Sequence, residues 1–193
     1  MERETMEYDV VVVGGGPSGL STAIKFAQMN KENGTDYSIC LLEKGSEIGA
    51  HILSGNVFQT TALDELIPNW KDLNAPLNVP VKKDKLLFLL KKISLPVPAF
   101  ILPTMSNHGN YVISLGNLCR WLAEQAESLG VEIFPGFPAS KLLYDGDKVV
   151  GVQTGDMGID ANGEIKPGNE PGIEIKAKYT ILGEGCRGHL GKE

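Results

Sequence analysis

The sequence YDVVVVGGGPSG, which runs from Tyr8 to Gly19, decides the fold. Its four consecutive valines predict a buried strand, because β-branched residues favour strands and a strand covered on both faces is continuously apolar. Beyond the glycines, apolar residues at helical spacing predict a helix over residues 20–29. A second apolar run over 37–42 predicts the next strand, which ends at Glu43. Together these segments predict one βαβ unit.

The glycines of this stretch occupy the positions of a G-x-G-x-x-G motif. Gly14 permits a tight turn, Gly16 lets the backbone approach a pyrophosphate, and Gly19 allows the helix to pack closely on the strand. The pyrophosphate is expected at the helix N-terminus, where free N–H groups and the helix dipole attract an anion. Pro17 suits the first helical turn, because its missing N–H has no intrahelical partner there. Ser18 completes the predicted dinucleotide-binding turn.

Glu43 lies 24 residues past the last glycine of the motif. A carboxylate at the end of the second strand accepts hydrogen bonds from ribose hydroxyls and disfavours a 2′-phosphate. The alternative is a plain glycine turn with a surface glutamate, and the strand–turn–helix context argues against it. The motif itself admits both NAD and FAD. A second glycine-rich loop over 45–57 favours FAD, because a longer ligand must be held beyond its adenosine half.

The rest of the chain predicts an α/β fold, namely a Rossmann-like FAD-binding domain with mixed β insertions, as in an incomplete two-domain flavoprotein. Three parts are expected: a βαβ unit with the second glycine loop (1–57), an insertion with extended or hairpin pieces (58–110), and a continuation of the FAD-binding domain with a β-hairpin, truncated at the C-terminus (111–193). The further expected elements are a short helix over 60–67 with Thr61 as its N-cap, strands over 111–114 and 131–134, a helix over 117–128, a hairpin over 140–152, a turn-rich segment over 154–172 and a strand over 173–182.

Composition restricts the function. The 193 residues carry a net charge of −6, which argues against nucleic-acid binding. The three cysteines are far apart in sequence and form no C-x-x-C motif, which argues against a metal or iron–sulfur site and against a disulfide framework. Cys40 and Cys119 are expected to be small buried hydrophobic residues. No stretch approaches the roughly 20 apolar residues that span a bilayer, and residues 1–7 resemble neither a secretory signal nor a transit peptide.

Seven motifs, taken in order, closely resemble the N-terminal part of the electron-transfer flavoprotein:ubiquinone oxidoreductase family. They are Gly14–Gly19, Glu43-Lys44, Ile48–Gly55, Pro68–Lys71, Asn107–Tyr111, Glu124–Glu127 and Gly183–Leu190. The resemblance runs along essentially the whole chain. It implies a membrane-associated enzyme that takes electrons from reduced electron-transfer flavoprotein and passes them to ubiquinone, using one FAD and one [4Fe-4S] cluster. The family attaches to the membrane surface without a transmembrane helix.

The resemblance also implies which residues contact FAD. By analogy with other FAD enzymes, the carboxylate in Gly183-Glu184-Gly185 faces the second ribose or the ribityl chain. The expected cofactor-binding residues are Gly14, Gly16, Pro17, Ser18, Gly19, Glu43, Lys44, Gly49, Ala50, His51, Ser54, Gly55, Glu184 and Gly185. No catalytic residue and no metal ligand are expected here, because the cofactor carries the chemistry and the cluster ligands belong to a C-terminal region.

The chain is therefore expected to be an N-terminal fragment that is inactive in isolation. Its expected location is the cytoplasmic side of a bacterial inner membrane, or the matrix side of the mitochondrial inner membrane for a processed eukaryotic chain. The resemblance places the insertion 58–110 on the quinone or membrane side. It assigns the apolar stretches 48–69 and 93–103 to the same side, although 93–103 could equally be a buried extended segment.

Several alternatives stay open. A geranylgeranyl-reductase or aromatic-hydroxylase type of flavoprotein would share the glycine motif, and an inactive dinucleotide-binding module is a further possibility. His51 is equally compatible with a contact near the flavin and with a loop histidine bonded to backbone. His108 is expected to make local hydrogen bonds in a turn. His189 could face the pyrophosphate or stand at an exposed helix start.

Overall fold

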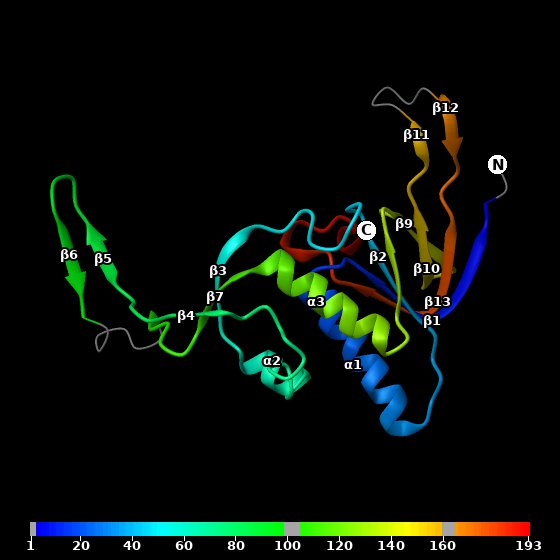
Figure 1. Ribbon diagram of the computed structural model, residues 1–193. Helices are drawn as coiled ribbons and strands as arrows, with labels where there is room; N and C mark the ends of the chain where they lie inside the picture. The colour runs from blue at the N-terminus through cyan, green and yellow to red at the C-terminus, as the bar shows by residue number, and fades with distance from the viewer. Residues whose placement is uncertain (1–2, 99–104, 160–164) are drawn as a thin grey trace. The chain divides into compact units, whose positions relative to one another are not determined.

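The computed structural model describes residues 3–98, 105–159 and 165–193. The chain divides into two compact units, one made of Met1–Ile52 and Cys119–Glu193, the other of Leu53–Leu118. Figure 1 labels the elements of both. The expected apolar stretch 93–103 extends beyond residue 98, so its last residues lie outside the described part.

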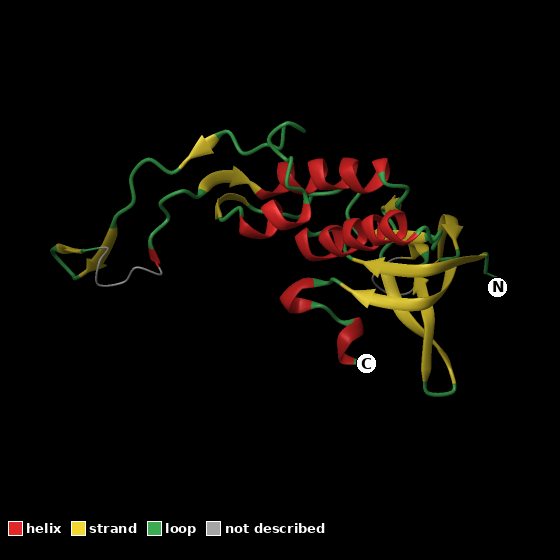
Figure 2. Ribbon diagram, turned by 90° about the horizontal axis from the view of Figure 1, so that it is seen from below, coloured by secondary structure: helices red, strands yellow, loops and turns green. Residues whose placement is uncertain are grey.

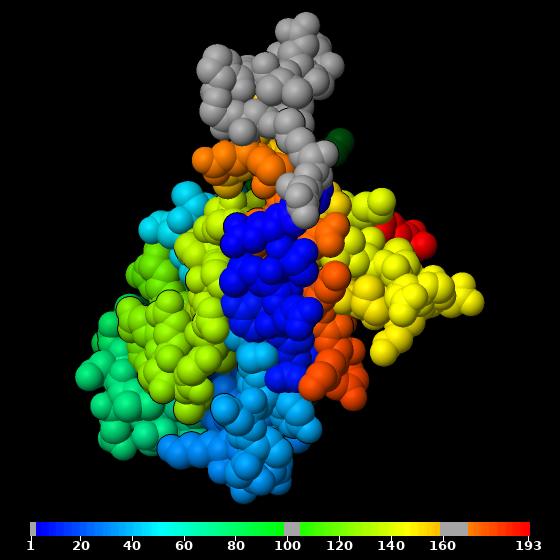
Figure 3. Space-filling model, turned by 90° about the vertical axis from the view of Figure 1, so that its right-hand side faces the viewer, coloured from blue at the N-terminus to red at the C-terminus, as the bar shows by residue number. Residues whose placement is uncertain are grey.

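A six-stranded sheet with the order β8-β2-β1-β13-β10-β9 organises the first unit. Its strands are β1 (Thr5–Val13), β2 (Ile39–Glu43), β8 (Glu132–Pro135), β9 (Ala139–Asp145), β10 (Lys148–Thr154) and β13 (Glu174–Leu182). Neighbouring strands from β8 to β13 pair in parallel, and β10 and β9 add an antiparallel hairpin. In Figure 3, β1 (blue) lies along β13 (orange). The predicted α/β, Rossmann-like class is confirmed.

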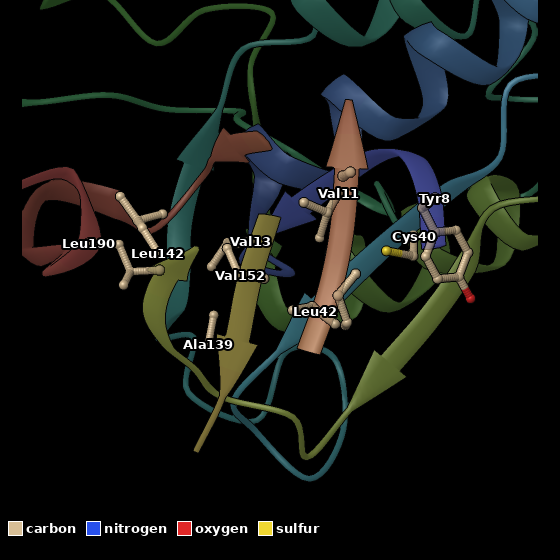
Figure 4. Close-up of a cluster of buried hydrophobic side chains, with 11 residues drawn as sticks. Tyr8, Val11, Val13, Cys40, Leu42, Ala139, Leu142, Val152 and Leu190 are labelled. Carbon is tan, nitrogen blue, oxygen red and sulfur yellow. The ribbon is translucent and has the colours of Figure 1, made fainter. Parts of the chain in front are cut away.

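Successive side chains of β1 point to opposite faces of this sheet, and a separate buried core lies on each face. Helix α1 (Pro17–Asn33) covers one face, where Val12 points at Gly19 of the helix. The part of α3 (Leu115–Ser128) that belongs to this unit lies on the same face (Figure 2). On the other face, Val11 and Val13 enter a buried cluster with Val152 and with side chains from β2, β9 and the last turn of the chain (Figure 4).

The buried thiols belong to these cores. Cys40 and Cys119 are both fully buried, as predicted. Burial raises the pKa of the Cys40 thiol to about 12, so it stays neutral and packs as an apolar group.

The second unit contains two small sheets and one short helix. Its elements are β3 (Ser54–Phe58), α2 (Thr61–Leu66), β4 (Val79–Pro80), β5 (Leu86–Leu89), β6 (Ser94–Val97) and β7 (Tyr111–Ser114). One sheet has the order β3-β7-β4, and β5 and β6 form a separate antiparallel hairpin. Trp70 is buried, meets the ring of Tyr111 edge-on at 6.0 Å and donates a 2.7 Å hydrogen bond to Asp64.

Two local predictions were wrong. The N-cap of α2 is Thr60 and not Thr61, and the Thr60 hydroxyl donates to the Asp64 side chain instead of capping the helix. The turn-rich segment 154–172 contains two paired strands, β11 (Met157–Ile159) and β12 (Ile165–Glu170), with residues 160–164 outside the described part. These strands continue the antiparallel ladder of β10 and β13, so pairing already set up by their neighbours outweighs the weak local strand signal.

The chain ends in two short 3-10 turns, η3 (Gly185–Arg187) and η4 (Leu190–Lys192). Among the described residues, no helix is long and apolar enough to cross a membrane.

Candidate cofactor site

The carboxyl ends of β1, β2 and β13 meet at one edge of the six-stranded sheet and hold the predicted glycine turn. The Gly14 N–H donates to the Leu42 carbonyl at 2.8 Å, and the Gly183 N–H donates to the Val13 carbonyl at 2.7 Å. Backbone therefore ties the turn to both neighbouring strands. Ligands of open α/β sheets bind outside this edge of the strands.

Gly14 and Gly19 allow two backbone segments to approach at a distance that no side chain permits. Gly14 adopts a left-handed φ of 109°, and a Cβ built on it would lie 2.5 Å from the Gly183 carbonyl oxygen. A Cβ on Gly19 would lie 1.9 Å from the Gly14 carbonyl oxygen. The start of α1 is thus pressed onto the end of β1, as the motif requires.

Gly16 differs from these two glycines because its side-chain position faces open space. It is the N-cap of α1 with an extended backbone, and no atom lies within 4 Å of a Cβ built there. No side chain caps the helix, and its first turn contains no acidic residue. The first N–H groups of a helix have no intrahelical acceptors, so this end of α1 can receive an anion without competition from a carboxylate.

Glu43 stands beside this helix end with its carboxylate fixed by backbone. Oε2 accepts from the Gly15 N–H at 2.8 Å and Oε1 from the Gly45 N–H at 2.7 Å, and the side chain is only 14% exposed. Each carboxylate oxygen has two lone pairs. One acceptor position on each oxygen therefore remains, which suits a pair of neighbouring hydroxyl donors such as those of a ribose.

Gly15 and Gly45 are site residues that the sequence analysis did not include. A Cβ on Gly15 would lie 2.5 Å from the Ile48 side chain and 3.0 Å from Glu43 Oε2. A Cβ on Gly45 would lie 3.1 Å from Glu43 Oε1. The middle glycine of the run 14–16 and the glycine two residues after Glu43 were the available signals.

Four other predicted residues, Lys44, Gly49, Ala50 and His51, belong to the loop that follows Glu43. His51 Nδ1 lies 4.0 Å from Glu43 Oε1, and the imidazole is 61% exposed, so it is available to a ligand. Lys44 and Ala50 are exposed, and Gly49 has a left-handed φ of 84°.

Burial, with a smaller contribution from the Glu43 charge, raises the pKa of the Cys119 thiol in α3 to about 11, so this thiol stays neutral.

Several known proteins match this chain in sequence over all or nearly all of its length. A family model described as an NAD(P)-binding Rossmann-like domain matches residues 12–73. The electron transfer flavoprotein-ubiquinone oxidoreductase of Pseudomonas aeruginosa is 58% identical over the whole chain. Mitochondrial proteins of the same name from Arabidopsis thaliana and Mus musculus are 52% identical over 97% of the chain and 50% identical over all of it.

The chain is similar along essentially its whole length to part of these electron transfer flavoprotein-ubiquinone oxidoreductases. This confirms the predicted resemblance. The chain spans 36%, 29% and 32% of the length of these three relatives, or about a third. The similarity therefore concerns one part of a longer polypeptide in the relatives.

Solved structures resemble the chain in fold. A geranylgeranyl bacteriochlorophyll reductase-like protein from Thermoplasma acidophilum matches 97% of the chain and 42% of its own, with a TM-score of 0.70 and 23% identity. A myxobacterial chondrochloren halogenase, described as a variant of FAD-dependent halogenases, matches 96% of the chain and 39% of its own, with a TM-score of 0.62 and 18% identity. At these identities the likeness concerns the fold alone.

Two further predicted residues lie in the second unit. The Ser54 hydroxyl donates to Ser114 Oγ at 2.7 Å, and Gly55 has a left-handed φ of 84° in β3. Ser106 Oγ accepts from the backbone N–H of His108 at 3.5 Å, a local contact of the kind expected for this residue.

The carboxylate of Glu184 contacts its own chain. Oε1 accepts from the His189 and Leu190 N–H groups at 3.2 and 3.4 Å, and Oε2 accepts from the Gly191 N–H at 3.2 Å. His189 Nδ1 lies 3.3 Å from Oε1. Glu184 thus caps the turn η4, while Gly185 provides a left-handed φ of 74°. Its contact with a ribose or ribityl chain stays a prediction.

Proposed function

We propose that this chain is the N-terminal FAD-binding part of a membrane-associated oxidoreductase that passes electrons from reduced electron-transfer flavoprotein to ubiquinone. The single observation that carries the FAD proposal is the uncapped N-terminus of α1 beside the fixed carboxylate of Glu43. The family name supports the electron donor and acceptor.

The residues fit the ADP half of FAD. The open face at Gly16 and the amides at the start of α1, including that of Ser18, would hold the pyrophosphate. The two free acceptor positions of Glu43 would bind the adenosine ribose. Residues 49–51 with Ser54 and Gly55, and Glu184 with Gly185, are proposed to lie near the remainder of the cofactor. When bound, FAD supplies the redox chemistry, and the protein binds and orients it.

The [4Fe-4S] cluster is proposed to be ligated outside this chain. Within the described residues, no group of three or more His, Cys, Asp or Glu side chains is arranged to hold a metal. Since the relatives are about three times as long as the chain, we expect the isolated 193 residues to lack electron-transfer activity and to bind FAD weakly.

The membrane proposal is supported by the β5–β6 hairpin. Leu87, Phe88, Leu89 and Leu95 are 45%, 60%, 73% and 49% exposed. A large exposed apolar surface of this kind marks a membrane or partner contact. The proposed location is the cytoplasmic face of a bacterial inner membrane or the matrix face of the mitochondrial one, and the relatives include both bacterial and mitochondrial proteins.

The test uses the complete polypeptide that contains this chain. We expect it to purify with a flavin absorption spectrum and to reduce a soluble ubiquinone analogue when reduced electron-transfer flavoprotein is supplied. A flavin-free protein that also fails to bind added FAD would contradict the cofactor proposal. A flavin-loaded protein that does not oxidise electron-transfer flavoprotein would contradict the proposed reaction.

A further inference from the structure

The β5–β6 hairpin has apolar side chains in its middle and lysines at both ends. Its apolar residues are Leu86, Leu87, Phe88, Leu89, Leu90, Ile93, Leu95 and Val97. Lys91 and Lys92 form the turn, which the Leu90 N–H closes by donating to the Ile93 carbonyl at 2.9 Å. Lys82, Lys83 and Lys85 precede β5 at the base.

All five lysines are exposed, and in the described part of the chain none of them forms an ion pair. Asp84, the only acidic residue between Lys82 and Lys92, accepts two hydrogen bonds from Asn107, at 2.8 and 3.2 Å. Residues 82–92 therefore carry a net charge of +4, whereas the whole chain carries −6. This local reversal of charge points to a negatively charged partner surface.

The cross-strand register gives the hairpin one fully apolar face. Leu86 pairs with Val97 and Phe88 with Leu95, so these four side chains share a face, while Ser94 pairs with Leu89 on the opposite one. The two strands pair only with each other among the described strands. A two-stranded hairpin has no interior of its own, so its apolar face gains most from a lipid or protein surface.

We propose that the β5–β6 hairpin lies flat in the interface of an anionic phospholipid bilayer, with the Phe88 face toward the acyl chains and the lysines of both ends among the headgroups. This inference rests on the proposed membrane association and adds the lipid charge and the orientation of the hairpin.

The length of the strands and the expected effect of each lysine on binding favour the flat orientation over insertion of the hairpin with its turn leading. Four-residue strands are about 13 Å long at roughly 3.3 Å per residue, which is close to half of a hydrocarbon core about 30 Å thick. Insertion with the turn leading would carry Lys91 and Lys92 near the bilayer midplane, where each lysine weakens binding by about 30-fold or more. In the flat orientation each lysine near an anionic surface strengthens binding by roughly fivefold.

Lipid charge is tested by sedimentation of the 193-residue chain with vesicles of phosphatidylcholine alone and of phosphatidylcholine mixed with phosphatidylglycerol. We expect binding at least about tenfold stronger to the mixed vesicles. The double substitution Lys91→Gln/Lys92→Gln should remove roughly 25-fold of that binding. The matched control is Lys141→Gln/Lys148→Gln, which changes two exposed lysines of the β9–β10 hairpin and should leave binding unchanged.

The depth of the hairpin is tested with a fluorescent label on Leu86→Cys or Leu90→Cys, in a Cys186→Ser background that leaves only buried native thiols. Both positions lie on the Phe88 side of the strand by alternation, one at the base and one at the turn. Quenching by lipids brominated at different depths should place the two labels equally deep. A label at 90 that is deeper than the label at 86 would overturn the flat orientation.

The possible outcomes distinguish a failure of this inference from a failure of the membrane proposal on which it rests. Equal binding to both kinds of vesicle would overturn the anionic preference and leave the membrane proposal standing. No binding to either kind would overturn both this inference and the assignment of the hairpin as the membrane contact. Stronger binding to mixed vesicles that is lost in the lysine variant and kept in its control supports the inference.

Discussion

The glycine turn depends on the absence of side chains, whereas the β5–β6 hairpin exposes large apolar ones. At the turn, the absence of side chains on Gly14 and Gly19 lets three strands and a helix meet by backbone contact. In the hairpin, Phe88 and Leu89 are large, apolar and mostly exposed. Packing within the chain fixes the structure of the glycine turn, whereas the apolar side chains of the hairpin are available to another surface. Substitutions at Gly14 and Gly19 should therefore affect folding, and those in the hairpin should affect binding.

The largest expected effect is on folding, at Gly19. A methyl group added by Gly19→Ala meets the Gly14 carbonyl oxygen at 1.9 Å, and neither backbone segment can give way easily. We expect Gly19→Ala to lower the free energy of unfolding by about 3 kcal/mol, measured by urea denaturation of the 193-residue chain.

The matched control for this variant is Gly155→Ala. Its added methyl group would meet only ordinary contacts, the nearest at 3.6 Å from Pro138. Stability of the control should stay within about 0.5 kcal/mol of the parent chain. Equal losses in the two variants would show that close approach at Gly19 is not the cause.

The second effect is expected at Glu43, which links folding to binding. Glu43→Ala leaves the buried Gly15 and Gly45 N–H groups without their acceptor, and we expect a loss of about 2 kcal/mol in unfolding free energy. FAD affinity of the complete polypeptide should also fall. Glu47→Ala is the control, because Glu47 is exposed and its ion pair with Arg120 contributes little. Unchanged FAD affinity in Glu43→Ala would remove Glu43 from the site.

Gly19 and Glu43 show how much of the site could be predicted from the sequence. The βαβ unit and Glu43 were predictable because strand, turn, helix and acidic residue follow one another at fixed spacing. The contacts of Gly15 and Gly45 were not, because they depend on where the Glu43 side chain turns after folding. The contacts of Glu184 with the last turn, and the pairing of β11 with β12, likewise depend on tertiary neighbours.

In the hairpin, a smaller effect on folding is expected. Phe88→Ala removes a side chain that is 60% exposed, so the free energy of unfolding should change by less than about 1 kcal/mol. Binding to vesicles that contain phosphatidylglycerol should fall by about tenfold, because Phe88 lies on the face that contacts the acyl chains in the proposed orientation. A clear loss of stability would show that the hairpin is packed against protein, which would contradict the difference between the hairpin and the glycine turn.

The smallest effect is expected from pH. Hydrogen bonds from the Arg3 guanidinium and the Gly172 N–H lower the pKa of Asp156 to about 2. Because this folded-state pKa lies below the unfolded value near 3.9, the contribution to stability is present above about pH 4 and is lost as the pH falls toward 2. Asp156→Asn should flatten the unfolding free energy across that range in acid titration. An unchanged pH profile would contradict the role of this pair.

The central claim is that the N-terminus of α1 holds the FAD pyrophosphate, and Gly16→Ala tests it most directly. An alanine at this position has an allowed backbone conformation and meets no protein atom within 4 Å, so folding should be unaffected or slightly stabilised. A methyl group placed where the pyrophosphate approaches should nevertheless weaken FAD binding by about tenfold or more. The measurement is an FAD titration of the complete polypeptide carrying Gly16→Ala, with Gly155→Ala as control. Normal stability with weakened FAD binding is the expected result, and unchanged FAD affinity would contradict the account.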